Sequence, residues 1–242
     1  MHEGGATIGP ETSTTSERVA QPQIRVVGLG GSLAATSASL AALKVALEGA
    51  AAAGADTELL NLRVLDLPMF QPTATPAEAV VRFCDTVYAA HGLLWSSPMY
   101  NGTVSGAFKN ATDWLHLLGD RQPPYLTDKI VGVMSTAGGI HGLQVVNTME
   151  FISRSLRAWA VPIVLPIARA SEVFGADGAV RDPRVAGQLR ALGQEVERAA
   201  RQMTQHGNCD WIDVGKCGRA QQHAVGRIRT SDRPGRSRGS IL

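Results

Sequence analysis

Cysteine is scarce in this sequence, and no apolar run is long enough to cross a membrane. The three cysteines (Cys84, Cys209 and Cys217) cannot build a disulfide framework, and none has the close pairing of a zinc or CxxC redox site. Because a membrane-spanning helix needs ~20 apolar residues, we expect no membrane partner. The first residues lack a basic region followed by an apolar one, so we expect no signal peptide and a location in the reducing cytoplasm. Cys84 lies in an apolar helical pattern and is interpreted as a small core residue.

An excess of one charge is also missing. The chain carries 23 Lys and Arg against 21 Asp and Glu, and its formal net charge is +2. Seven of these basic residues and only three of the acidic ones lie in residues 204–242, so the preceding part is mildly acidic. Because that part has no basic stripe, we expect no nucleic-acid partner for it.

The composition divides the chain into a folded domain and two polar ends. The 242 residues suffice for one α/β domain with a sizeable buried core, which we place at residues 23–203. Residues 1–22 are rich in Gly, Thr, Ser, Glu and Pro and are expected to form a disordered lead. Residues 204–242 show no periodicity and are expected to form a basic, disordered tail. The alternative is that this tail contacts a nucleic acid or an acidic partner.

Short apolar runs alternate with amphipathic segments inside the domain. Strands are predicted at 24–29, 57–62, 92–97, 129–135 and 161–165, and helices at 37–53, 76–91, 107–118, 142–159 and 183–203. Two of the apolar stripes that support the helices are Leu40, Leu43, Leu47 and Ala50, and Val185, Leu189, Leu192, Val196 and Met203. Asp182 and Pro183 provide a capping residue and a first-turn proline for the last helix. Five alternations of strand and helix predict an α/β fold, a parallel sheet covered on both faces.

Three informative loops each follow a predicted strand, at residues 30–37, 97–106 and 135–142. Right-handed crossovers bring the carboxyl ends of parallel strands to one edge, where ligands bind, so the three loops are expected to form one pocket. The first loop offers bare backbone N–H groups and hydroxyls in front of a helix N-terminus, an arrangement that favours a phosphate. Its candidate donors are Ser32, Thr36, Ser37 and Ser39.

The first loop fits none of the common phosphate or nucleophile motifs. A GxGxxG fingerprint that starts at Gly28 fails at Leu33, and a GxSxG nucleophile elbow fails at Ala34. The chain has no GxxxxGK[ST] run, which argues against an NTPase. A loop rich in hydroxyls and without lysine suits a phosphate that is held and not transferred. The alternative is a tight turn in which Ser37 only caps the helix.

The other two loops suit a planar ligand. The run Ser96-Ser97-Pro98-Met99-Tyr100-Asn101-Gly102 forms a flat platform with exposed backbone at the end of a strand. The run Ser135-Thr136-Ala137-Gly138-Gly139 offers N–H groups that side chains do not obstruct. The alternative for the platform is a turn that caps the next helix, with Tyr100 partly buried.

These features together resemble the NADPH-dependent FMN reductase family of flavodoxin-like proteins. The matching residues are Gly31-Ser32-Leu33 with Ser37, Pro98-Met99-Tyr100-Asn101-Gly102, Gly106-Ala107-Phe108-Lys109-Asn110-Ala111 with Asp113 and Trp114, and Ala137-Gly138-Gly139. The resemblance covers roughly residues 24–203. It implies a flavodoxin-like three-layer sandwich whose five-stranded parallel sheet has the order 2-1-3-4-5, and a homodimer or homotetramer.

The resemblance also implies a cofactor and its contacts. In the family the first loop holds the FMN phosphate, the second lies along the isoalloxazine and ribityl chain, and the third closes over the polar edge of the ring. The implied cofactor-binding residues are Ser32, Leu33, Ser37, Ser39, Pro98, Met99, Tyr100, Asn101, Gly102, Ser135, Thr136, Ala137, Gly138 and Gly139. Ala34 stands where the family often has Arg, which implies weaker, exchangeable FMN.

The implied function is a flavin-dependent oxidoreductase that uses NADPH (or NADH) to reduce FMN. Its electrons would pass to a small-molecule acceptor: free flavin, a quinone, an azo compound or a metal oxyanion. The alternatives are a flavodoxin-type electron carrier that does not oxidise NAD(P)H, and a regulatory protein with a decayed site. Carriers are usually strongly acidic, which this chain is not.

Flavin chemistry needs little from side chains, so we name no catalytic residue and no metal ligand. His141 is a possible proton donor, although a lone loop histidine is more often structural or exposed. Lys109 and Asp113 are expected to orient a loop or to face a partner subunit. One further helical seam suits either the core or a second copy of the chain, and it consists of Val145, Met149, Ile152, Leu156 and Trp159.

Overall fold

A computed structural model describes residues 22–206 of the chain. Most of the predicted lead at 1–22 and of the predicted tail at 204–242 therefore lies outside the described residues, and both stay predictions. Residues 204–206 belong to a helix, α7 (Pro183–His206), which continues beyond the predicted end at residue 203.

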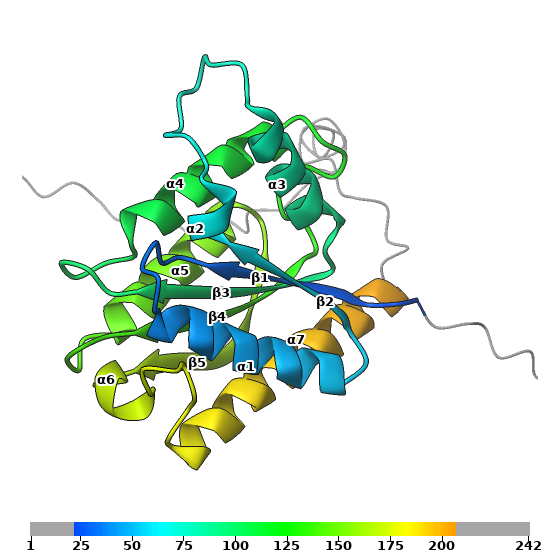
Figure 1. Ribbon diagram of the computed structural model, residues 1–242. Helices are drawn as coiled ribbons and strands as arrows, with labels where there is room; N and C mark the ends of the chain where they lie inside the picture. Colours follow the sequence, from blue (N-terminus) through cyan, green and yellow to red (C-terminus); the bar gives the residue numbers. More distant parts are fainter. Residues whose placement is uncertain (1–21, 207–242) are drawn as a thin grey trace, which may run out of the picture. The chain divides into compact units, whose positions relative to one another are not determined.

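A five-stranded parallel sheet forms the middle layer (Figure 1). Its strands are β1 (Arg25–Gly30), β2 (Asp56–Asn61), β3 (Gly92–Pro98), β4 (Ile130–Thr136) and β5 (Trp159–Ile167). The order in the sheet is β2-β1-β3-β4-β5, as the resemblance implied. Strands β1, β3 and β4 lie in the middle of the sheet and are almost entirely buried, because helices cover both of their faces.

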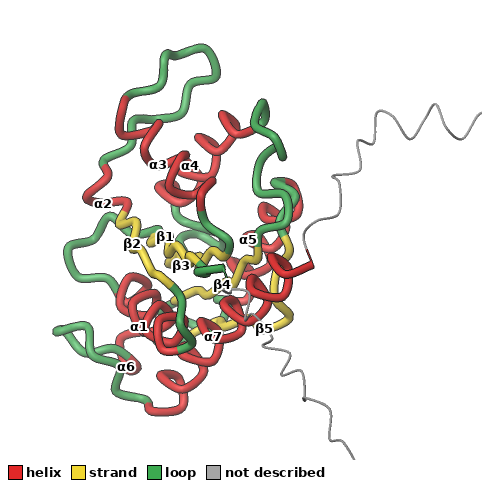
Figure 2. The backbone as a smooth tube through the Cα atoms, turned by 90° about the vertical axis from the view of Figure 1, so that its right-hand side faces the viewer, coloured by secondary structure: helices red, strands yellow, loops and turns green. Residues whose placement is uncertain are grey.

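Five longer helices form the outer layers (Figure 2). Helix α1 (Ala38–Ala52) and α7 pack on one face, against side chains such as Val26, Leu94 and Met134. Helices α3 (Glu78–Ala89), α4 (Gly106–Trp114) and α5 (Leu143–Ser155) pack on the other face. Three shorter turns of helix complete the fold: α2 (Leu62–Leu65), η1 (Leu115–Leu118) and α6 (Ala170–Val173).

The helix starts follow the capping signals of the sequence. Ser37 caps α1, and its Oγ accepts a hydrogen bond from the Leu40 N–H at 3.1 Å. Asp182 does the same for α7 through the Arg184 N–H at 2.9 Å. These backbone N–H donors hold the pKa of the Asp182 carboxyl below its usual value, because they favour the charged form.

The predicted helix over 142–159 is wrong at its C-terminal end. Helix α5 ends at Ser155, and Arg157 takes the left-handed conformation with φ 68°. The Trp159 N–H then donates to the Lys129 carbonyl at 2.9 Å, so Trp159 opens strand β5 and its side chain is 60% exposed. The seam therefore loses only Trp159: Val145 and Met149 are buried in the core of the same chain, and the partly buried Ile152 and Leu156 pack against it. Spacing alone could not detect this reversal, since Trp159 continues the helical period although it lies in strand β5.

Within residues 22–206, none of the helices combines the length and the apolar character that a membrane crossing requires. Cys84 is buried in α3 as a free thiol, and burial raises its pKa to about 12. Its interpretation as a core residue is confirmed. Cys209 and Cys217 lie outside the described residues.

Candidate functional site

The loops that follow β1, β3 and β4 meet at the carboxyl edge of the sheet (Figure 1). Between them lies a depression of about 210 Å³, which we call the strand-end depression. Its lining residues are Ser32, Ala34, Thr36, Ser37, Ala38, Ser39, Pro98, Met99, Tyr100, Thr136, Ala137, Gly138 and Ala170. The expectation that three loops far apart in the sequence form one pocket agrees with this geometry.

The first loop is held by a close approach at Gly31. Its N–H donates to the Ser96 carbonyl at 2.8 Å, and a Cβ at this position would lie 2.9 Å from the Cβ of Phe108. The buried Ser105 hydroxyl donates to the Gly31 carbonyl and accepts from the Phe108 N–H at 3.1 Å. Gly31 is therefore required because α4 packs directly against the loop.

Three hydroxyls of the first loop and of α1 face the depression. Ser32, only 5% exposed, accepts a hydrogen bond from the Ala34 N–H at 3.2 Å. The hydroxyls of Ser37 and Ser39 lie 3.0 Å apart, and Ser39 is 1% exposed. Ser37 is thus both the cap of α1 and part of the lining.

The second loop is a tight hairpin. Tyr100 and Thr103 exchange two backbone hydrogen bonds, of 3.1 and 3.2 Å. Asn101 (φ 50°) and Gly102 (φ 86°) occupy the two positive-φ positions between them, which is the conformation that an Asn-Gly pair adopts readily. The hairpin leaves Tyr100 53% exposed at the rim of the depression.

The third loop is joined to its neighbours through the backbone. The Met99 N–H donates to the Thr136 carbonyl at 2.9 Å, and the Ala170 N–H donates to the Ala137 carbonyl at 3.0 Å. A Cβ at Gly138 or Gly139 would meet no atom within 4 Å, so the backbone there is open to a ligand.

Not every residue of the predicted site faces the depression. Leu33 is 59% exposed and lies outside the lining, as do Asn101, Gly102 and Gly139. Ser135 is fully buried, and its hydroxyl donates to the Gly142 carbonyl at 2.7 Å, which holds the third loop in place. Whether these residues contact a flavin stays a prediction.

Ala170 completes the lining from the first residue of α6. Ala170 follows strand β5, so the same search for loops after predicted strands could have identified it. The sequence interpretation also missed the buried hydroxyls of Ser96 and Ser105. Ser96 donates to the Ser39 carbonyl at 2.7 Å, which ties β3 to the start of α1.

The run on α4 that carried part of the family resemblance supports a loop outside the depression. The Asn110 side chain accepts from the Phe70 N–H at 2.7 Å and donates to the Pro68 carbonyl at 3.0 Å. The Trp114 indole N–H donates to the same carbonyl at 2.8 Å. Lys109 and Asp113 form an ion pair on the exposed side of α4. Asn110 and Trp114 therefore anchor the segment after α2 and do not line the depression.

Among residues 22–206, no Asp, Glu, Lys, Arg or His side chain lines the strand-end depression. Its polar groups are hydroxyls and backbone N–H groups, together with the N-terminus of the 15-residue helix α1. Such a donor set suits an anion that is bound and not transformed. In the part of the chain that the structure describes, no cluster of three metal-ligating side chains occurs.

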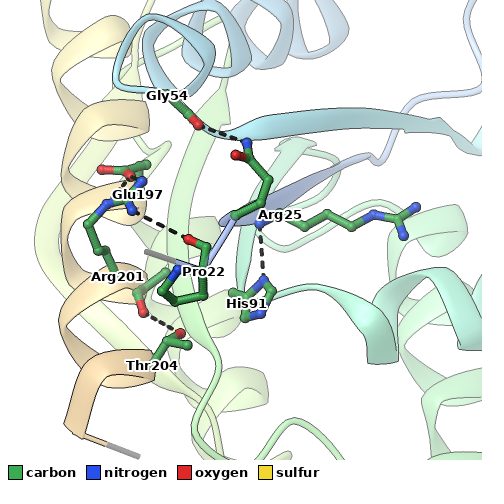
Figure 3. A network of polar contacts seen from close by, with 9 residues as sticks. Pro22, Arg25, Gly54, His91, Glu197, Arg201 and Thr204 are labelled. Atoms are coloured by element: carbon green, nitrogen blue, oxygen red, sulfur yellow. Dashed lines mark hydrogen bonds and ion pairs between the residues drawn. The ribbon is translucent and has the colours of Figure 1, made fainter. Parts of the chain in front are cut away.

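Two further titratable groups with a lowered pKa, His91 and Lys129, lie at the opposite, amino edge of the sheet, where Figure 3 shows His91 beside Arg25. His91 precedes β3, and its Nδ1 accepts a hydrogen bond from the Arg25 N–H at 3.0 Å. Burial, and then the charges of Lys129 and Arg25, lower the pKa of His91. Burial also lowers the pKa of Lys129 to about 8, and its Nζ donates to the Tyr88 and Ala90 carbonyls. These groups stabilise the fold and are remote from the depression.

Comparison with known proteins identifies relatives that are named as FMN reductases and quinone oxidoreductases. The sequence model of the NADPH-dependent FMN reductase family matches residues 24–172. The NADPH-dependent FMN reductase ArsH of Acidithiobacillus ferrooxidans is 29% identical over 128 residues, 53% of each chain. The NADPH:quinone oxidoreductase of Arabidopsis thaliana is 31% identical over 126 residues, 50% of this chain and 62% of the relative. The chain thus matches between about half and two thirds of the length of these two relatives.

A solved structure shares the fold. The flavoenzyme NAD(P)H:(acceptor) oxidoreductase FerB of Paracoccus denitrificans superposes with a TM-score of 0.58 at 24% identity. The superposition covers 76% of this chain and 98% of FerB.

Proposed function

Because the chain belongs to the NADPH-dependent FMN reductase family, we propose that it is an NAD(P)H-dependent flavin oxidoreductase that passes electrons to a small acceptor. The observation that carries this proposal is the strand-end depression, where three loops present hydroxyls and open backbone N–H groups. The acceptor class is a free flavin, a quinone, an azo compound or a metal oxyanion, in keeping with the names of the relatives.

The residues of the depression fit FMN. Ser32, Ser37 and Ser39 surround the N-terminus of α1, where a phosphate gains both hydrogen bonds and the favourable end of the helix dipole. Pro98, Met99 and Tyr100 offer an apolar wall on which the flat ring can lie. The open backbone at Gly138 allows N–H groups to approach the polar edge of the ring.

The flavin supplies the redox chemistry when it is bound, accepting hydride from the nicotinamide. The chain's own task is to hold and orient the ring. Backbone N–H groups of the third loop would stabilise the negative charge that a bound flavin gains on its pyrimidine edge, without a catalytic base. His141 is exposed in this loop, outside the lining.

We further propose a homodimer or homotetramer that works in the cytoplasm. The strand-end depression, at about 210 Å³, is smaller than the ~300–1,000 Å³ of most ligand pockets, so a second subunit is expected to complete the enclosure of the ring. Helix α5 exposes Leu143 (48%) and Phe151 (70%), and Phe151 lines a hollow of about 420 Å³ that α4 also lines. Exposed apolar side chains of this size favour contact with a second copy.

Oxidation of NADPH in air by the purified protein, with and without added FMN, tests the proposal. Steady, flavin-dependent loss of absorbance at 340 nm is expected, followed by transfer to a quinone or azo dye. A protein that binds flavin but leaves NADPH unchanged would be an electron carrier instead. A protein that binds no flavin would refute the assignment altogether.

A further inference from the structure

Each of the three loops that surround the strand-end depression carries one large apolar side chain that is exposed. They are Leu33 in the first loop, Tyr100 in the second and Ile140 in the third, and each is more than half exposed. Leu33 is flanked by two lining residues, and Ile140 follows Gly138, another lining residue, by two positions. We call Leu33, Tyr100 and Ile140 the apolar rim. One exposed apolar residue needs no explanation, but three in separate loops around one depression indicate a surface for a ligand or a partner.

The loop that carries Ile140 is tied down on both sides of this residue. Before it, the Ala137 N–H donates to the Ile167 carbonyl at 2.9 Å. After it, the Gly142 carbonyl accepts from the buried Ser135 hydroxyl at 2.7 Å. Ile140 between these bonds is 74% exposed, so a fixed loop presents its apolar side chain to solvent beside the depression.

The three loops contain no Lys, Arg, Asp or Glu, and the structure describes all of their residues, which are 31–37, 98–105 and 137–142. The His141 imidazole is the one group in them that can carry a positive charge. Arg169 directly precedes the lining residue Ala170, but its side chain lines a different hollow and pairs with Glu172 at 3.4 Å. The rim therefore offers little counter-charge to an anionic ligand.

The N-terminus of α1 is the feature of the depression that most favours an anion, and the proposed function gives it to the flavin phosphate. A second anion would lose water beside apolar side chains without gaining a positive partner, which costs free energy. An uncharged planar molecule gains free energy when it covers the rim, because apolar surface leaves water on both sides of the contact.

We propose that the apolar rim selects uncharged planar acceptors of the quinone class over metal oxyanions and other anionic acceptors, and that Ile140 is a residue that determines this specificity. The inference rests on the proposed function and narrows its acceptor class. In the reaction the quinone gains two electrons and two protons and leaves as the hydroquinone. NADPH supplies the electron pair and one proton as a hydride by way of the bound flavin, and water supplies the second proton.

Steady-state kinetics of the FMN-loaded full chain, at saturating NADPH and without oxygen, test the inference. The acceptors are a methyl-substituted naphthoquinone and the same ring with a sulfonate in place of the methyl group. The unsubstituted protein is expected to show the lower KM for the methyl compound. Ile140→Ser is expected to raise that KM about fivefold and to leave the KM for the sulfonate unchanged, because part of an apolar contact is lost. Ile140→Lys is expected to lower the KM for the sulfonate about threefold at low salt, since it adds a charge of opposite sign.

Val64→Lys is the matched control. Val64 is 77% exposed on α2, and within residues 22–206 neither α2 nor β2 contributes to the lining of the depression, so both KM values should stay unchanged. Each acceptor is compared between variants, so the intrinsic reactivities of the two quinones cancel. FMN titration should give the same affinity for every variant, because the inference assigns Ile140 to the acceptor and not to the flavin.

Unchanged KM values in both Ile140 variants, or equal changes for the two acceptors, would overturn the inference. Lower FMN affinity in Ile140→Ser would assign this side chain to the flavin instead. A changed oligomeric state of Ile140→Lys in sedimentation velocity, with both KM values altered alike, would assign the rim to a second subunit. Reduction of neither acceptor by the unsubstituted protein would remove the proposed function as well, whereas in the other cases both acceptors are still reduced.

Discussion

Ser105 connects the first loop to helix α4, and its removal should weaken both the fold and the flavin site. The residue is 3% exposed. Its hydroxyl caps α4 by accepting from the Phe108 N–H, and it donates to the carbonyl of Gly31 in the proposed phosphate loop. The substitution Ser105→Ala removes both interactions without adding volume.

The expected magnitude follows from these two losses. A lost helix cap costs ~0.5–2 kcal/mol, and a buried carbonyl left without its donor costs ~1–3 kcal/mol. The two hydrogen bonds share one atom, so we expect a combined loss of about 2–4 kcal/mol in the free energy of unfolding. The Gly31 backbone also loses its tether, so flavin affinity should fall together with stability.

Urea unfolding of the flavin-free protein and flavin titration of the folded protein measure the two effects. Ser155→Ala is the matched control, because the exposed Ser155 hydroxyl only donates to the Ile152 carbonyl within α5. Its effect on stability should stay within ~0.5 kcal/mol. A loss below 0.5 kcal/mol for Ser105→Ala, with unchanged flavin affinity, would refute the argument that this hydroxyl holds the loop.

Three further predictions address the depression, pH and assembly. Ser32→Ala should weaken flavin binding by about 1–2 kcal/mol in a titration, and unchanged affinity would exclude Ser32 as a phosphate ligand. The pKa of His91 is lowered in the folded chain, so below pH ~6.5 the unfolded chain binds more protons and stability should fall with pH. Urea midpoints at pH 7.5 and 5.5 should differ less in His91→Gln than in the unsubstituted protein, and equal slopes would exclude His91 as the cause. Phe151→Glu should shift the protein to monomers in sedimentation velocity, and an unchanged oligomer would place the contact elsewhere.

The positions of the three site loops could be predicted from the sequence. Each loop directly follows a buried strand, and the carboxyl ends of parallel strands lie at one edge of the sheet. The Asn101-Gly102 pair likewise indicates a tight turn, and the structure shows the hairpin with two positive φ angles. The supporting contacts were not predictable in this way. Ser96 lies inside a predicted strand and Ser105 in a predicted loop, and only the packing of α1 and α4 shows what their buried hydroxyls hold.

The C-terminal end of α5 likewise could not be predicted from the sequence. Leu156 and Trp159 continue the helical spacing, but the left-handed Arg157 turns the chain into β5, where pairing with β4 determines the position of Trp159. The spacing of apolar residues indicates which side chains are buried, but it does not indicate where a helix ends and the chain changes direction.

The sequence by itself determined the alternation of strands and helices, the three strand-end loops and the family, because each of these depends on residues that are close together in the sequence. Only the tertiary structure decided which hydroxyls face the depression and which hold its loops in place. Those facts depend on how closely α1, α4 and α7 approach the sheet and one another, and contacts between distant residues set that approach.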